Sequence, residues 1–200
     1  VSKPTFTKVQ YRTASDVDFL GNFTIGDLQA KCPDLFVSPD AAKASPLVVD
    51  LNKKPNEIGV KNKYYACFAL DDVDAAIKSA KIDKINNDTS KIIITLNDEK
   101  EPAVTSLKAE KAASFTGAFL NVLTPTQKKA ISDAVSSTDL TFVSSGSTVE
   151  LTYNVKTNQI ISLVSTAKYK LTRSDSIFGL FDLKGNTTIT DICECTDFVY

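Results

Sequence analysis

The stretch from Ser147 to Leu171, STVELTYNVKTNQIISLVSTAKYKL, constrains the fold more than any other part of this chain. Apolar residues alternate with polar ones from Val149 to Val155, and a second alternation runs from Ile161 to Leu171 after the polar segment KTNQ. An alternation of period two is typical of a strand that buries one face. The stretch therefore predicts a long β-hairpin with one apolar and one polar face.

The same pattern predicts how the side chains of this hairpin are divided between its two faces. The side chains expected to face one common core are Val149, Leu151, Tyr153, Leu163 and Tyr169. The side chains expected to face solvent are Glu150, Thr152 and Lys168. Because a slip of one residue moves every side chain to the opposite face, the burial of these residues tests the register.

Short helices are predicted at several places. The segment TPTQKKAISDAV (124–135) opens with a capping box of Thr124 and Gln127, with Pro125 at the first helical position. This combination is a strong signal for the start of a helix. The acidic segment DDVDAAIKSA (71–80) and the segment before Pro33 also predict short helices.

The remaining segments predict strands, turns and loops. Residues 80–102 predict a hairpin with its turn at NNDT, and residues 5–12 alternate weakly, as an edge strand would. Further short strands are expected near Leu47, at 65–70 and at 140–143, whereas 37–46 is expected to be a loop. Together these patterns predict an α+β fold made of mainly antiparallel, curved sheet, with a few short helices packed on one face.

The chain length suits one domain or two closely packed halves. Its 200 residues fall in the usual range for a single domain, and we expect one domain over 1–200. A weak internal similarity at an offset of 57 places residues 71–78 on 128–135 and residues 92–97 on 149–154. This similarity leaves open two similar α+β halves, at about 1–105 and 106–200.

The residue types that are missing exclude several kinds of chemistry. The chain has no His, so the Ser-His-Asp and Cys-His catalytic arrangements have no base, and the commonest metal ligand is absent. Neither glycine-rich phosphate-binding motif occurs, and a net charge of -1 without a basic stripe argues against nucleic-acid binding. No apolar stretch is long enough to span a membrane. We therefore expect no catalytic residue, no cofactor and no metal.

The four cysteines are Cys32, Cys67, Cys193 and Cys195, which allow three complete pairings. Cys193 and Cys195 would point to the same face of a strand and should not pair with each other. A site with four thiolate ligands to zinc disagrees with their spacing. Two interpretations stay open: a disulfide between Cys32 and Cys67, or four small buried apolar side chains. The acidic neighbours of Cys193 and Cys195 also argue against a reactive thiolate.

Two clusters of carboxylates are candidates for ligand or catalytic groups. The first cluster is Asp71, Asp72 and Asp74, and the second is Asp98, Glu99 and Glu101. Neither follows the spacing of a calcium-binding loop. A pair of sugar-hydrolysing carboxylates usually lies in a cleft lined by aromatic residues, and the chain has no Trp. Both clusters are therefore interpreted as solvated charges.

One resemblance bears on location. YNVKTNQI resembles the Y-D-x-K-T-G-x-I hairpin turn of many exported proteins of Gram-positive bacteria, with Asn158 where Gly usually stands. The order of YACFALDDV, KIIITLNDEKEP, FLNVLT, LTYNVKTNQIISL and TDFVY over residues 64–200 resembles an uncharacterised group of secreted proteins or lipoproteins from anaerobic, gut-type clostridia. The resemblance implies β-rich architecture and a secreted or membrane-anchored protein at the cell surface. It carries no site residue.

Two functional classes follow, with an enzyme of unknown type third. The first is a non-catalytic exported or cell-surface module, binding or structural, whose partner is a surface protein or a polysaccharide. The second is a lipoprotein-type carrier that holds an apolar ligand in a half-barrel. If the helix at 125–136 covers the face of Val149, Leu151, Tyr153 and Leu163, the core is full. A carrier instead needs a cavity above a few hundred cubic ångströms, lined by Phe and Leu.

Overall fold

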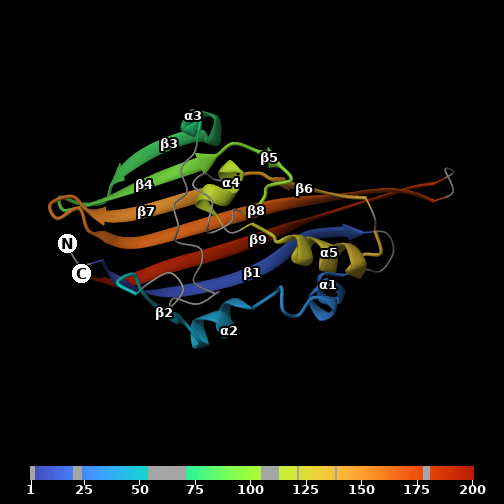
Figure 1. The fold of residues 1–200 in the computed structure, drawn as a ribbon, viewed down its shortest axis with the longest axis horizontal. Helices are drawn as coiled ribbons and strands as arrows, with labels where there is room; N and C mark the ends of the chain where they lie inside the picture. The colour runs from blue at the N-terminus through green and yellow to red at the C-terminus, as the bar shows by residue number, and fades with distance from the viewer. Residues whose placement is uncertain are drawn as a thin grey trace.

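The computed structural model describes residues 3–19, 24–53, 71–104, 113–120, 122–137, 139–177 and 181–200. These residues form an antiparallel sheet of nine strands with five short helices, which confirms the predicted α+β, mainly β fold (Figure 1). The strands are β1 (Thr5–Phe19), β2 (Leu47–Asp50), β3 (Ile77–Lys84), β4 (Thr89–Leu96), β5 (Glu99–Lys100), β6 (Leu140–Ser144), β7 (Thr148–Asn154), β8 (Ile160–Ile177) and β9 (Phe181–Val199). The helices are α1 (Ile25–Lys31), α2 (Pro39–Ala44), α3 (Val73–Ala76), α4 (Phe115–Phe119) and α5 (Pro125–Ala134).

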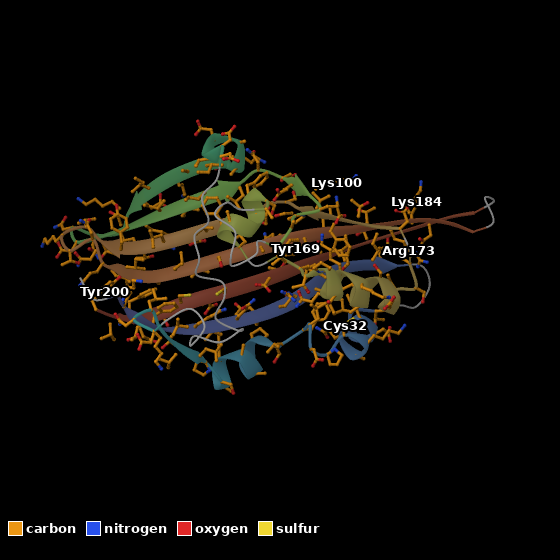
Figure 2. The ribbon with its side chains drawn as sticks, in the orientation of Figure 1. Cys32, Lys100, Tyr169, Arg173, Lys184 and Tyr200 are labelled. Atoms are coloured by element: carbon orange, nitrogen blue, oxygen red, sulfur yellow. The ribbon has the colours of Figure 1, made fainter. Side chains whose placement is uncertain are left out.

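The sheet brings the two ends of the chain together. Its strand order is β2-β1-β9-β8-β7-β4-β3, so the first and last strands are neighbours in one sheet. β6 pairs with β8 beyond the end of β7, and the short β5 pairs with β6. β8 and β9 run past their neighbours as a two-stranded arm (Figure 1). Figure 2 shows Arg173 and Lys184 where this arm leaves the body of the sheet.

The predicted pairing of the hairpin is confirmed, since Leu151 of β7 lies opposite Leu163 of β8. Its predicted faces are confirmed on β8, where Lys168 is exposed and Tyr169 is buried. On β7, Glu150 and Thr152 were expected to face solvent but are half-buried, as Leu151 is. The prediction of one common core is wrong. Val149 packs against the main core, in which Tyr169 is buried, whereas Leu163 packs against a second, smaller cluster. These side chains lie on one continuous face of the sheet, but along the long strands that face packs into two separate hydrophobic clusters.

A β-bulge joins β6 to β7 and sets this register. Ser144 lies opposite Tyr169, and Thr148 lies opposite Thr166. Between these two pairs, the segment that joins β6 to β7 contains one residue more than the facing part of β8. Gly146 has φ +69° at the bulge, a conformation that glycine adopts without steric cost. The extra residue turns Val149, rather than Thr148, toward the helices.

The main core lies between one face of the sheet and the helices α1 and α5, which lie over the same face in Figure 1. It joins buried residues of both helices to β6, β8 and β9: Leu28, Ile131, Val135, Phe142, Tyr169, Leu171 and Ile189. A second cluster contains Phe6, Val49, Cys193 and Cys195. The helices therefore cover the sheet unevenly, and the polar residues of β1 and β9 lie between the two clusters.

The predicted helix after Thr124 is confirmed. α5 runs from Pro125 to Ala134, Thr124 accepts a hydrogen bond from Gln127 N, and the reciprocal bond of the capping box is present. α1 ends before Pro33 as expected, and the hairpin of β3 and β4 turns at NNDT.

One other prediction is wrong, two are wrong in part, and one is not tested. The segment 37–46 contains α2, because Ser38 caps it and Pro39 takes its first position. The predicted helix over 71–80 is only the single turn α3, and β3 begins at Ile77. β1 is flanked by β2 and β9 from Thr5 to Lys8, so it is no edge strand there, whereas from Val9 onward β9 is its only strand partner among the described residues. The strand predicted at 65–70 lies outside the described residues.

Strands from both halves of the chain enter the same sheet. The two segments of the internal similarity, in β4 and β7, pair side by side, with Ile92 opposite Leu151. Each is preceded by a helix, α3 or α5, although α3 is far shorter than α5. The duplication itself stays a prediction.

Candidate functional site

A pocket of about 500 Å³ lies along the edge of β1. β2 pairs with β1 only from Thr5 to Lys8. Beyond Lys8, the segment before α2 lies beside β1 in place of β2, since Arg12 N donates a hydrogen bond to Val37 O at 3.2 Å. The space between β1, this segment and α2 is the pocket, which we call the β1 pocket. Its lining comprises Lys8, Gln10, Tyr11, Arg12, Asp34, Leu35, Val37, Ala41, Ala42, Ser45, Leu47, Gln127 and Asp191.

The floor of the β1 pocket holds a buried ion pair. Arg12 of β1 and Asp191 of β9 lie directly opposite each other, and their side chains are 8% and 2% exposed. Arg12 Nη2 lies 2.5 Å from Asp191 Oδ2, and Gln10 Nε2 donates to both carboxylate oxygens at 3.0 and 3.1 Å. Burying these charges is costly unless hydrogen bonds satisfy both groups. Asp191 meets this condition.

Arg12 meets this condition only in part. Its Nη1 donates to Leu35 O at 3.5 Å, but its Nε is buried without any hydrogen-bond partner. Among the side-chain atoms of the described residues, only Thr116 Oγ1 shares that condition. An unsatisfied buried donor costs about 1–3 kcal/mol. Beside the β1 pocket, Arg12 Nε is thus a buried guanidinium N–H that no described residue accepts.

The electrostatics of the floor are set by burial. Burial raises the pKa of Asp191, although the Arg12 cation and the hydrogen bonds from Arg12 and Gln10 oppose the rise. The nearby Lys8 cation opposes it as well. We attribute the net rise to the loss of hydration, because the carboxyl group is almost entirely inaccessible to water.

The cysteines near this floor are unsuited to nucleophilic chemistry. Cys193 and Cys195 follow Asp191 on the same face of β9, and both are buried. A hydrogen bond with Cys195, followed by burial, raises the pKa of Cys193 far above its ordinary value. The Cys193 thiol therefore keeps its proton at neutral pH.

Cys32 lies away from these residues, beneath α5. Its thiol is buried, forms no disulfide with another described cysteine, and donates to Ala130 O at 3.5 Å. Burial raises its pKa. The predicted disulfide partner, Cys67, lies outside the described residues. The Cys32–Cys67 pairing therefore stays a prediction.

Several residues of the carboxylate clusters have structural roles, so their interpretation as purely solvated charges was incomplete. Asp72 caps α3 through Ala75 N. Glu99 accepts hydrogen bonds from Phe115 N and Thr116 N at the start of α4. Glu101 accepts one from Phe142 N at 2.7 Å and pairs with Lys128. Within the described ranges, no group of three or more Cys, Asp or Glu side chains could hold a metal ion.

A second hollow, of about 530 Å³, lies at the other end of the sheet, between the β7–β8 turn and the end of the chain. Tyr200 covers it, and its hydroxyl accepts a hydrogen bond from Ile160 N at 2.6 Å. Figure 2 shows Tyr200 far from Arg173 and the arm. None of the described residues that line it is fully buried, so it has no desolvated polar floor. The β1 pocket is therefore the stronger candidate site.

Sequence reasoning did not find the β1 pocket. The polar residues Lys8, Gln10 and Arg12 stand at alternate positions, which on a strand means one face. That face would ordinarily be assigned to solvent, with Val9 and Tyr11 inside. The structure places this face of β1 against the helices, because it lies on the same side of the sheet as the buried Ile189 and Cys193 of β9.

No protein-family model, curated protein or solved structure matches the chain. None of the helices within the described ranges combines the length and apolar character that crossing a bilayer requires. The site is therefore interpreted from its own geometry.

Proposed function

We propose that this protein is a non-catalytic exported or cell-surface module that binds a small molecule in the β1 pocket. The observation that carries the proposal is the buried, incompletely satisfied Arg12–Asp191 pair on the pocket floor. The volume, about 500 Å³, falls within the range of about 300–1,000 Å³ that is usual for small-molecule sites. The location follows from the resemblance to secreted proteins and lipoproteins of Gram-positive bacteria.

Binding without turnover is supported by the chemistry of the lining. The chain has no His, and the Cys193 thiol near the floor holds its proton. The carboxyl group of Asp191 is engaged by Arg12 and Gln10. The Tyr11 hydroxyl donates to Glu194 Oε1 at 3.0 Å, but burial raises the pKa of Tyr11, so this hydroxyl keeps its proton at neutral pH.

A carrier of a wholly apolar ligand fits this pocket less well. The expected lining was Phe and Leu, whereas the described lining contains Leu35, Leu47 and Val37 beside charged and amide groups, without a Phe. An apolar ligand would offer no hydrogen bond to the charged and amide groups of this lining. The carrier function remains the alternative proposal, and a bound acyl chain in purified protein would favour it.

The test uses a variant that blocks the pocket. Ala41 is exposed on α2 and lines the pocket, whereas Ala44 is exposed on the same helix outside it. In a thermal-shift screen of small metabolites, at least one compound should stabilise the wild type and Ala44→Trp but leave Ala41→Trp unchanged. A ligand at a hundred times its Kd stabilises a protein by about 2.7 kcal/mol, which such a screen detects.

Two results would contradict the proposal. In one, no compound stabilises the wild type, or Ala41→Trp responds as the wild type does, so that the pocket is not the site. In the other, the purified protein converts its bound compound into a product and Ala41→Trp does not, which would make it an enzyme.

A further inference from the structure

We propose that two copies of this chain associate through β3, so that an antiparallel pair of β3 strands joins their sheets into one. β3 is the last strand in the order of the sheet, and β4 is its only strand partner among the described residues (Figure 1). The outer edge of such a strand carries backbone N–H and C=O groups that can pair with another strand. The β1 pocket lies toward the opposite edge of the sheet, away from this interface.

The side chains at the middle of β3 are open to solvent. Ile82 is 68% exposed, and the side chains of Lys81 and Asp83 beside it are 64% and 48% exposed. Ile82 lies opposite Ile92 of β4, which in turn lies opposite Leu151 of β7, so the three form an apolar row across the sheet. A strand paired with β3 would extend this row and cover Ile82, and that burial favours association.

The segments at the two ends of β3 are bonded toward β4. Asn97, which follows β4, donates from its backbone N–H to Ala76 O and from its side chain to Ala75 O, both at 2.9 Å. These bonds tie the end of α3 to the β4 side of β3. In the turn at the other end, Ile85 N donates to Thr89 O at 3.0 Å. Neither set of bonds uses the outer edge of β3.

The charges of β3 favour one register of self-pairing. When Ile82 lies opposite Ile82 of the second copy, Lys81 lies opposite Asp83 of the second copy, and the two-fold axis repeats this pair. Opposite charges directly across two strands attract each other, whereas like charges there are destabilising. Centring the pair on Lys81 or on Asp83 instead places like charges opposite each other, and centring it on Ala80 joins no opposite charges.

This register also accommodates the lysines of β3. Lysines on an edge strand usually oppose pairing with another chain. Here Lys84 lies opposite Ala80 of the second copy and Lys81 lies opposite Asp83, so no two lysines face each other. Within one copy, Lys81 Nζ already lies 3.0 Å from Asp83 Oδ2, on the same face of the strand. Pairing would therefore give each of these two side chains a second opposite charge.

The experiment is sedimentation velocity of the whole chain over a dilution series, with charge-reversal variants in β3. The wild type should show a concentration-dependent equilibrium between monomer and dimer. Asp83→Lys and Lys81→Asp each place like charges opposite each other at both symmetric positions. Each should therefore raise the Kd of the dimer at least about tenfold. Because both side chains are largely exposed, neither change should disturb the fold, which circular dichroism and thermal unfolding can check.

The two single variants together test the register. An equimolar mixture of Asp83→Lys and Lys81→Asp restores opposite charges at both positions, so heterodimers should form where each variant alone is monomeric. The double variant Lys81→Asp/Asp83→Lys should dimerise as the wild type does. The matched control is Lys78→Glu, an exposed charge reversal on the same strand that faces no charged residue in this register. It should leave the Kd nearly unchanged.

Three results would overturn the proposal. A wild type that stays monomeric up to about 1 mM would exclude a second copy as the partner and leave the edge to a strand of another protein. A dimer that neither Asp83→Lys nor Lys81→Asp weakens would have its interface away from β3. Loss of the dimer in both single variants without recovery in their mixture would contradict the register centred on Ile82.

Discussion

Arg12 and Asp191 form an ion pair in which both side chains are more than nine-tenths buried. Buried pairs contribute little net stability, because the loss of hydration offsets their attraction. Removal of one partner is costly, since the other is left as a lone buried charge. The pair is therefore a sensitive point in the stability of the sheet and the centre of the proposed site.

Arg12→Gln should destabilise the protein by about 3–5 kcal/mol at pH 7, measured by urea unfolding. Adding Asp191→Asn to that variant should recover part of the loss, because no charge then stays unpaired. The folded-state pKa of Asp191 is already raised and would rise further without Arg12. Stability linked to a raised pKa is present at low pH and lost as pH rises through it. The deficit of Arg12→Gln should therefore shrink on acidification, and a deficit constant with pH would contradict this.

Asp175 gives the opposite pH dependence. Burial alone would raise the pKa of Asp175, but hydrogen bonds from Ser137 and Arg173 outweigh it and lower that pKa. The carboxylate also accepts a bond from Asp139 N at 3.1 Å. Its contribution to stability is therefore present above the unfolded pKa of about 3.9 and lost as pH falls through the lower, folded value.

Asp175→Asn should accordingly cost about 1.5–3 kcal/mol at pH 7, since the lost hydrogen bonds involve a charged group. The difference from wild type should narrow below about pH 4, where the wild type begins to lose the contribution. Urea unfolding at several pH values measures it. Asp133→Asn, at an exposed carboxylate paired only along α5, should change stability by less than about 0.5 kcal/mol. If the difference in unfolding free energy between Asp175→Asn and the wild type widened at low pH, the predicted lowering of the Asp175 pKa would be wrong.

Among the helices and strands, α5 allows the contribution of its N-terminal capping box to stability to be measured. Thr124 Oγ1 accepts from Gln127 N at 3.2 Å and Gln127 Oε1 accepts from Thr124 N at 3.0 Å. Thr124→Ala should lower the free energy of unfolding by about 0.5–2 kcal/mol, because the first-turn amide loses its acceptor. Thr126→Ala, at an exposed position in the same turn, should be neutral. Equal effects of the two changes in thermal or urea unfolding would mean that the cap contributes nothing.

The bulge between β6 and β7 makes a second prediction at this scale. A Cβ at Gly146 would meet no close neighbour, since the nearest atom, on Lys168, is 4.0 Å away. The cost of Gly146→Ala is therefore conformational, about 1–2 kcal/mol for a residue held at φ +69°. Gly26→Ala in α1, where φ is ordinary and the nearest atom is 3.5 Å away, should instead be neutral or stabilising. Chemical denaturation of both variants checks the contrast.

At the scale of the whole molecule, the sheet order decides which strands are buried. β9 lies between β1 and β8, so Ile189 is enclosed by strands from both ends of the chain and is fully buried. β3 lies at the edge of the sheet, and Ile82 there is 68% exposed. Nothing in the local pattern of either isoleucine separates them.

Ile189→Ala should therefore destabilise by about 2–5 kcal/mol, through lost burial and the cavity that is left. Ile82→Ala should cost far less, because the side chain has little burial to lose. Both variants can be compared by thermal unfolding with the same baseline. Similar losses in the two would mean that the assignment of β3 to the edge and β9 to the interior is wrong.

The sequence by itself determined the elements whose signals are local. The alternation on both sides of KTNQ predicts the β7–β8 hairpin and its faces, and the cap at Thr124 predicts α5. The turn NNDT similarly predicts the β3–β4 hairpin. These succeed because strand pairing across a tight turn and helix capping involve residues close in the sequence. The Ser-Pro signal before α2 was equally local and was misinterpreted as a loop.

Only the tertiary structure decided which face of β1 is inside. Its own pattern puts Val9 and Tyr11 inside, yet pairing with β9 turns Lys8, Gln10 and Arg12 toward the helices. The partner that makes this possible, Asp191, lies 179 residues further along the chain. A buried charge needs a specific opposite charge, and no rule of periodicity reaches that far. The β1 pocket exists because strands from the two ends of the chain meet in one sheet.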